Sequence, residues 1–159
     1  MSAHAPDLHG AGLRVGIVWS RFNEEIVRAL VTACDKQLVE LGVSHDDIDV
    51  VSVPGSLEIP LALQSLALAR RGFAHRYDAL VALGAVVRGD TYHFEVVSNE
   101  SARAIMDLTL QGYAIGNGIL TVLNEAQAIE RCDPRQLDKG GAAARAALAL
   151  HELRAQYAP

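Results

Sequence analysis

The chain has 159 residues, 50% of them hydrophobic, and a formal net charge of -5 at pH 7. This length allows one domain with a full core and is too short for two. The net negative charge leaves no basic surface of the kind that binds nucleic acid. The first ten residues contain no apolar run of signal-peptide length, and no later stretch is long enough to span a membrane, so we expect a cytoplasmic protein without a membrane partner.

The first part of the chain predicts a flexible segment, a strand and a helix. Residues 1–12 are expected to be flexible, and residues 13–159 to form a single domain. Residues 13–19 are rich in Val and Ile and predict a buried strand. Asn23 is interpreted as an N-cap, and apolar residues at helical spacing follow it. Cys34 belongs to that apolar stripe, which indicates core filling rather than a reactive thiol.

A strand, a helix and another strand come next. Residues 48–53 predict the second strand, and a turn follows at 54–56. We expect Pro60 to start a helix that runs to Arg71 and ends at Gly72. The apolar run at 79–83 predicts the third strand.

The remainder of the chain predicts a helix at 93–111 and a strand at 113–122, interrupted by Gly116 and Gly118. Two further helices are expected, at 124–131 and 140–156. Strands alternate with helices and no hairpin signal separates them, which is typical of parallel crossovers. We therefore predict an α/β fold, a three-layer α/β/α sandwich with a four-stranded parallel sheet and a flavodoxin-like outline.

Ligands bind beyond the carboxyl ends of strands in such sheets. The segments expected to meet there are 20–23, 54–58, 84–93 and 116–118. The segment 84–93 links a strand to a helix start and contains Asp90, Thr91 and His93. Free backbone N–H groups at a helix start bind anions, and an imidazole can relay a proton at neutral pH. This combination indicates an enzyme that acts on a small phosphorylated molecule.

Several of these residues have more than one interpretation. Phe22 is either a stacking platform for a ring or a lid over the sheet edge. Glu58 can complement a helix N-terminus or accept hydrogen bonds from ligand hydroxyls, and one position allows both. Arg88 can neutralise a phosphate or pair with a surface carboxylate. His93 is favoured as a proton-transfer group, with capping or packing as its alternative.

Two basic residues lie outside the converging segments. Arg131 ends the predicted helix at 124–131, and Lys139 follows a polar loop. Each is interpreted first as an ordinary surface base. If they bind an anion, the geometry of a helix end or a neighbouring subunit must bring them to it.

Six segments of the chain together resemble one enzyme family. They are SRFN at 20–23, VPGSLEIP at 53–60, GAVVRGDTYHF at 84–94, GILT at 118–121, EAQAIER at 125–131 and DKG at 138–140. In this order, over about residues 13–152, the chain closely resembles lumazine synthase. Members condense 5-amino-6-(D-ribitylamino)uracil with 3,4-dihydroxy-2-butanone 4-phosphate to give 6,7-dimethyl-8-ribityllumazine, phosphate and water. The resemblance implies that no cofactor and no metal takes part.

The resemblance also implies roles for single residues at the ring and ribityl end of the site. It assigns Phe22 to stacking on the pyrimidine. It assigns Ser56, Leu57 and Glu58 to the ribityl chain and the adjoining ring edge. Backbone contacts to the uracil are implied for the run Ala85, Val86 and Val87.

At the phosphate end, the resemblance assigns Asp90 and Thr91 to holding the phosphate, with Arg131 adding its charge. His93 matches the family's proton-transfer histidine, and Lys139 matches a lysine near the phosphate. Asn117 stands where many members have an aromatic residue that the adjacent subunit supplies, and its amide can bond the heterocycle edge instead.

The resemblance implies a homopentamer with active sites between adjacent subunits. Pro134 stands in a loop that is glycine-rich in members that build icosahedral shells, which favours pentamers that do not assemble further, with sixty-subunit shells as the alternative. A non-catalytic flavin or lumazine carrier on the same fold is the main alternative. Two others are a nucleotide-binding module, which lacks a Gly-x-Gly-x-x-Gly turn here, and a purely structural shell protein.

Overall fold

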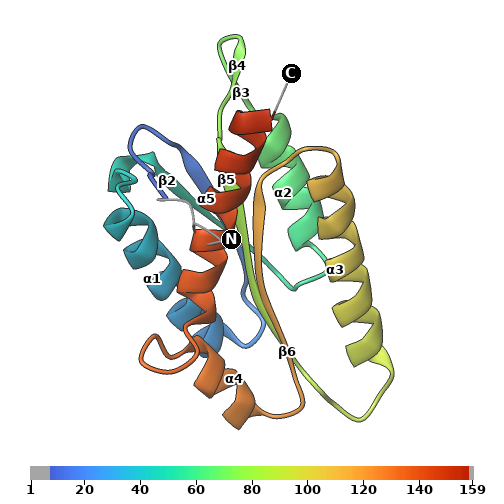
Figure 1. The fold of residues 1–159 in the computed structure, drawn as a ribbon. Helices are drawn as coiled ribbons and strands as arrows, with labels where there is room; N and C mark the ends of the chain where they lie inside the picture. Colours follow the sequence, from blue (N-terminus) through green and yellow to red (C-terminus); the bar gives the residue numbers. More distant parts are fainter. Residues whose placement is uncertain (1–7, 158–159) are drawn as a thin grey trace, which may run out of the picture.

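The structure, a computed structural model, describes residues 8–157. Within them, the main sheet has four parallel strands in the order β2-β1-β5-β6 (Figure 1). They are β1 (Val15–Ser20), β2 (Ile48–Val53), β5 (Ala79–Val87) and β6 (Ile115–Val122). The predicted three-layer α/β fold with a four-stranded parallel sheet is confirmed.

Helices cover both faces of this sheet (Figure 1). One face packs against α1 (Glu24–Glu40), α4 (Glu125–Cys132) and α5 (Lys139–Tyr157). The other face packs against α2 (Ile59–Leu68) and α3 (His93–Leu110). Parallel strands buried on both faces need the near-continuous apolar sequence that β1 and β5 have. No helix within residues 8–157 is both long and apolar enough to span a bilayer.

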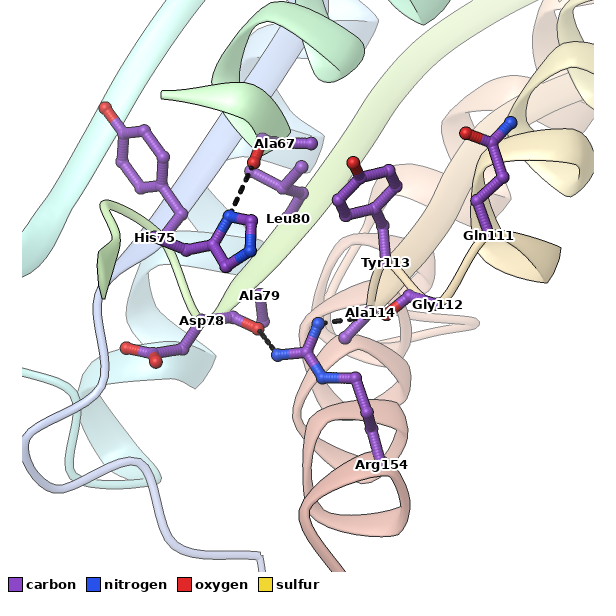
Figure 2. Close-up of a pocket in the computed structure, with 11 residues that line it drawn as sticks. Ala67, His75, Asp78, Ala79, Leu80, Gln111, Gly112, Tyr113, Ala114 and Arg154 are labelled. Carbon is purple, nitrogen blue, oxygen red and sulfur yellow. Dashed lines mark hydrogen bonds between the residues drawn. The ribbon is translucent and has the colours of Figure 1, made fainter. Parts of the chain in front are cut away.

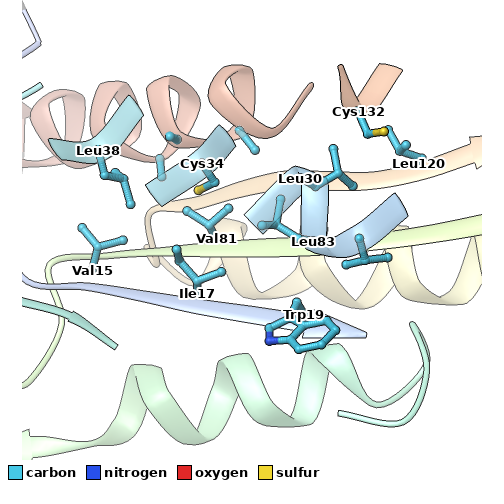
Figure 3. Close-up of a cluster of buried hydrophobic side chains, with 14 of the residues drawn as sticks. Val15, Ile17, Trp19, Leu30, Cys34, Leu38, Val81, Leu83, Leu120 and Cys132 are labelled. Atoms are coloured by element: carbon cyan, nitrogen blue, oxygen red, sulfur yellow. The ribbon is translucent and has the colours of Figure 1, made fainter. Parts of the chain in front are cut away.

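The larger core cluster lies between the sheet and α1, α4 and α5 (Figure 3). Cys34 and Leu38 of α1 face Ile17 and Val81 of the sheet, and all four are fully buried. Burial raises the pKa of the Cys34 thiol to about 12, so the thiol remains protonated at neutral pH. The prediction that Cys34 fills the core is confirmed.

The last two strands differ from the prediction. β5 continues through Val87, which pairs with Val122, so 84–87 is strand rather than loop. β6 runs through both of its glycines without interruption. The segment 116–118 is therefore mid-strand, and its expected place among the loops at the carboxyl edge was wrong. The physical reason is close packing, because a Cβ on Gly118 would already lie 3.0 Å from the Cβ of Ala143 in α5.

The region after α2 also differs. The helix ends at Leu68, and a small antiparallel hairpin follows, β3 (Arg70–Arg71) with β4 (Ala74–His75). Gly72 has φ +65° in the turn of this hairpin rather than after a helix. The expectation of no hairpin was wrong because Ala69 turns extended and accepts a hydrogen bond from the Arg76 N–H.

Shorter elements complete the chain. A 3-10 turn, η1 (His45–Asp47), precedes β2. The segment expected to be flexible is 1–12, and its first seven residues lie outside the described part of the chain. Of the rest of it, Gly10 is buried and donates its N–H to the carbonyl oxygen of Leu41 at 2.7 Å.

Candidate active site

A cavity of about 450 Å³ lies at the carboxyl edge of the sheet, on the side of α2 and α3. Its walls come from the loop after β1, the loop after β2, and the end of β5 with the start of α3. These are three of the four segments that we expected to converge. The position is the one where parallel sheets bind ligands.

The first wall is the loop that carries Phe22. Its backbone is fixed by hydrogen bonds from Arg21 N–H to Val53 O at 2.9 Å and from Phe22 N–H to Pro54 O at 3.1 Å. The Phe22 side chain remains 72% exposed while lining the cavity, so its ring is free to stack on a ligand.

Asn23 follows Phe22 and fixes the loop from the other side. It has φ 57° and ψ 47°, and its side chain makes no capping hydrogen bond to α1. Instead the amide Nδ2 donates to the carbonyl oxygen of Ala85 at 2.8 Å. The predicted N-cap role of the Asn23 side chain was wrong, because the left-handed backbone points the amide across the cavity toward β5.

The second wall contains Ser56, Leu57 and Glu58. The carboxylate Oε2 of Glu58 accepts the N–H of Gly55 at 2.8 Å, which holds the loop closed. Its Oε1 makes no hydrogen bond within the described residues. Ser56 is only 6% exposed, so its hydroxyl lies deep in the cavity.

The third wall joins the end of β5 to the start of α3. Ala85, Val86 and Val87 line it from the strand, and Thr91 and His93 from the turn and the helix. The Thr91 hydroxyl accepts the backbone N–H of His93 at 3.4 Å. A hydroxyl and an imidazole thus lie together at the positive end of a helix, where an anion is stabilised. Asp90 is exposed beside this wall and does not line the cavity.

Arg88 does not line the cavity. Its Nη1 lies 2.7 Å from the Oε1 of Glu95, and its guanidinium stacks 4.3 Å from the ring centroid of Phe94. The hydrogen bond from Arg88 lowers the pKa of the Glu95 carboxyl. Of the two interpretations of Arg88, the structure favours pairing with a carboxylate.

The remaining predicted residues lie in a second cavity of about 310 Å³, which contains Asn117, Arg131 and Lys139. It opens along β6 and α5, on the opposite face of the sheet from α2 and α3. Arg131 donates to Gln127 O at 3.1 Å, and Lys139 begins α5 with an exposed side chain. A single chain therefore does not bring these three residues to His93.

A third cavity of about 520 Å³ lies at the amino ends of β5 and β6, and no sequence motif indicated it. Figure 2 shows the guanidinium of Arg154 between two backbone carbonyl groups. It donates to Asp78 O at 2.9 Å and to Gly112 O at 3.0 Å. These bonds fasten the end of α5 to the strand starts, so we assign Arg154 a structural role. Within residues 8–157, no three His, Cys, Asp or Glu side chains are grouped to hold a metal ion.

Comparison with known proteins gives the family. The sequence model of 6,7-dimethyl-8-ribityllumazine synthase matches residues 12–155. The synthase of that name from Novosphingobium aromaticivorans is 53% identical over 141 residues, 89% of this chain and 96% of the relative. The one from Burkholderia vietnamiensis is 50% identical over 151 residues, 94% of this chain and 84% of the relative. The chain belongs to the 6,7-dimethyl-8-ribityllumazine synthase family.

Proposed function

We propose that this chain is the transferase that condenses 5-amino-6-(D-ribitylamino)uracil with 3,4-dihydroxy-2-butanone 4-phosphate, in the penultimate step of riboflavin biosynthesis. The observation that carries the proposal is the cavity of about 450 Å³, which combines an exposed ring, a buried hydroxyl and an imidazole at a helix start. Membership of the family supports the same reaction. A carrier would need no proton-transfer group beside an anion site, which disfavours that alternative.

The shape of the cavity suggests how the ribityl-uracil binds. The pyrimidine stacks on Phe22, and the backbone of Ala85 to Val87 contacts its edge. The ribityl chain extends toward Ser56 and Glu58. The free Oε1 of Glu58 supports this orientation, because a carboxylate oxygen accepts a ribityl hydroxyl well.

The phosphate end begins at the start of α3. Thr91, the backbone N–H groups near Asp90, and the helix dipole are the groups on this chain that stabilise a phosphate. Arg131 adds the positive charge that this turn lacks, since Arg88 is already paired with Glu95. Lys139 lies in the same cavity as Arg131 and supplies a second cation.

The chemistry needs positioning and proton transfer. An amine of the uracil attacks the ketone, and water leaves as the imine forms. Elimination of phosphate gives an enol that tautomerises to a second carbonyl group. The second amine adds to this carbonyl and loses a second water molecule, which closes the ring. Holding both reactants in register gives effective molarities of about 10⁵ M or more. His93 lines the cavity beside the phosphate turn, where its ring can move protons between the reacting nitrogen and oxygen atoms.

We infer that a neighbouring copy of the chain supplies Asn117, Arg131 and Lys139 to each site. Their cavity and the His93 cavity open on opposite faces of one sheet, so one chain cannot join them. The outer surfaces of α2 and α3 expose apolar side chains of the kind that oligomers bury. They include Leu61, Leu68, Val96, Met106 and Leu110. A homopentamer in which each copy completes the next copy's site satisfies both observations.

Turnover tests the reaction. The purified protein is mixed with both substrates, and the lumazine absorbance and released phosphate are followed against a protein-free control, because the uncatalysed condensation also proceeds. We expect both products to form faster with protein. A rate equal to the control would contradict the proposed function.

Complementation tests the shared site. His93→Ala and Arg131→Ala chains are co-expressed and purified as mixed rings. If His93 and Arg131 come from different copies, about a quarter of the sites in a randomly mixed ring have both native residues, and activity recovers to that level. Each variant assembled alone is the matched control. Mixed rings no more active than the two controls would show that the sites are not shared.

A further inference from the structure

Ser20, at the end of β1, is fully buried, and its hydroxyl has no hydrogen-bond partner within the described residues. Buried hydroxyl groups in folded proteins are nearly always paired, because an unpaired one loses its hydrogen bonds to water without replacement. An apolar residue at this position would avoid that cost. The unpaired hydroxyl therefore indicates a role that packing does not explain.

The location of Ser20 indicates which role. Residues alternate between the two faces of a strand, and Val18 of β1 belongs to the cluster under α2 and α3. Ser20 faces the same side, at the point where this cluster meets the cavity that holds Phe22 and His93. It lies beneath that cavity and not on its surface.

Gly84 of β5 brings Ser20 and Ser56 together. A Cβ on Gly84 would lie 3.0 Å from the Oγ of Ser20 and 2.8 Å from the Oγ of Ser56. Both hydroxyl groups thus converge on the space that the missing side chain leaves. The two hydroxyl groups make no direct hydrogen bond to each other, but both can bond to one water molecule held between them.

We propose that Ser20 is a positioning residue for the ribityl end of the site. Through one shared water molecule, its hydroxyl holds the Ser56 hydroxyl in one orientation, directed at a hydroxyl group of the ribityl chain. This inference rests on the proposed function and adds to it a residue that does not touch the substrate. Gly84 is part of the arrangement, because any side chain there would push the two hydroxyls apart.

The test is Ser20→Ala, which removes only the hydroxyl. We expect KM for 5-amino-6-(D-ribitylamino)uracil to rise about three- to tenfold, the range for one hydrogen bond. KM for the phosphorylated ketone and kcat stay within about twofold. Resistance to urea stays close to that of the native protein, because the Ser20 hydroxyl makes no hydrogen bond to another described residue.

A double-mutant cycle with Ser56→Ala identifies the route of the effect. If Ser20 acts through Ser56, adding Ser20→Ala to Ser56→Ala changes KM for the ribityl-uracil no further. Ser101→Ala is the matched control, since Ser101 is an equally buried serine of α3 that donates to Ser98 O. It should leave both KM values unchanged.

The outcomes separate this inference from the proposed function. If the native protein turns over both substrates and Ser20→Ala has the native KM, the inference about Ser20 alone is wrong. It is equally wrong if Ser20→Ala lowers urea resistance and kcat, or if its effect adds fully to that of Ser56→Ala. If the native protein does not exceed the protein-free rate, the inference falls together with the proposed function.

Discussion

The side-chain amide of Asn23 donates a 2.8 Å hydrogen bond to the carbonyl oxygen of Ala85, across the carboxyl edge of the sheet. This bond connects the loop that carries Phe22 to the strand that lines the opposite wall. It depends on the left-handed backbone of Asn23, a conformation that asparagine tolerates better than most residues. The loop that carries the exposed Phe22 ring is therefore held by the Asn23 side chain, which bonds to β5 and makes no capping hydrogen bond to α1.

Asn23→Ala should lower the free energy of unfolding by about 2 kcal/mol, because both the hydrogen bond and the tolerance of a positive φ are lost. Asn23→Gly is the control, since it keeps the backbone conformation and loses only the bond. We expect Asn23→Gly to lower the free energy of unfolding by about half as much as Asn23→Ala. Both variants should raise KM for the ribityl-uracil to a similar extent, because both lose the hydrogen bond to Ala85. Urea unfolding and steady-state kinetics measure both. Equal stability losses would contradict the role of the backbone.

His93→Ala should lower kcat by about 10²-fold without abolishing turnover, because positioning of the two substrates remains. Stability should stay within about 0.5 kcal/mol, since the side chain is exposed. His45→Ala, in the exposed turn before β2, is a control that should change neither quantity. Complete loss of turnover in a folded His93→Ala variant would mean that proton transfer, not positioning, dominates the rate.

Much of the scaffold could be predicted because the strands and helices have local sequence signals. The bounds of β2 and the start of α3 agree with the prediction, since a β-branched run and a strand-to-helix turn define them. The converging loops followed from the parallel order of the strands. The chemistry expected of these loops rested on Phe22, Ser56 and His93. All three follow strand ends, and in a parallel sheet the carboxyl ends of the strands lie at one edge.

The errors came from contacts that are distant in sequence. Glycines at positions 116 and 118 predict a break in the strand when only the local sequence is considered. In the structure, their lack of a side chain allows α5 to pack closely on β6. Asn23 immediately precedes α1, which predicts a capping role, but its side-chain amide bonds to Ala85 of β5 instead. Arg131 was expected to lie outside the converging segments, and it lies in the cavity along β6, apart from His93.

The Tyr77 hydroxyl donates a 2.7 Å hydrogen bond to Asp49, which also pairs with Arg76 at 3.2 Å. The bond from Tyr77, followed by that from Arg76, lowers the pKa of the Asp49 carboxyl. A carboxyl whose pKa is lower in the folded state stabilises the fold above its unfolded pKa of about 4. That stabilisation is lost as the pH falls through the folded pKa.

Tyr77→Phe should therefore lower the free energy of unfolding by about 0.5–1 kcal/mol at pH 7, a modest value because Asp49 is about one-third exposed and screened. The difference from the native protein should shrink below pH 4. Urea unfolding at pH 7 and pH 3 gives both values. Tyr92→Phe is the control, since Tyr92 is exposed and its hydroxyl makes no hydrogen bond within residues 8–157. If the stability difference between Tyr77→Phe and the native protein were larger at pH 3 than at pH 7, the assigned direction of the Asp49 pKa shift would be wrong.

Gly116 controls how closely α5 approaches β6. A Cβ at this position would collide with the carbonyl oxygen of Ala143, a backbone atom that cannot move without the helix. Gly116→Ala should therefore lower the free energy of unfolding by about 3 kcal/mol or more. The displaced α5 also forms one side of the cavity with Arg131 and Lys139, so KM for the phosphorylated ketone should rise more than KM for the ribityl-uracil.

Gly89→Ala is the matched control for stability, because a Cβ there has no neighbour within 4 Å. Its free energy of unfolding should stay within about 0.5 kcal/mol of the native value. Urea unfolding compares the two variants, and kinetics with each substrate varied in turn compares the KM values. A Gly116→Ala protein as stable as Gly89→Ala would mean that α5 and β6 separate freely, and the cavity along β6 would then be too loosely built to hold a phosphate.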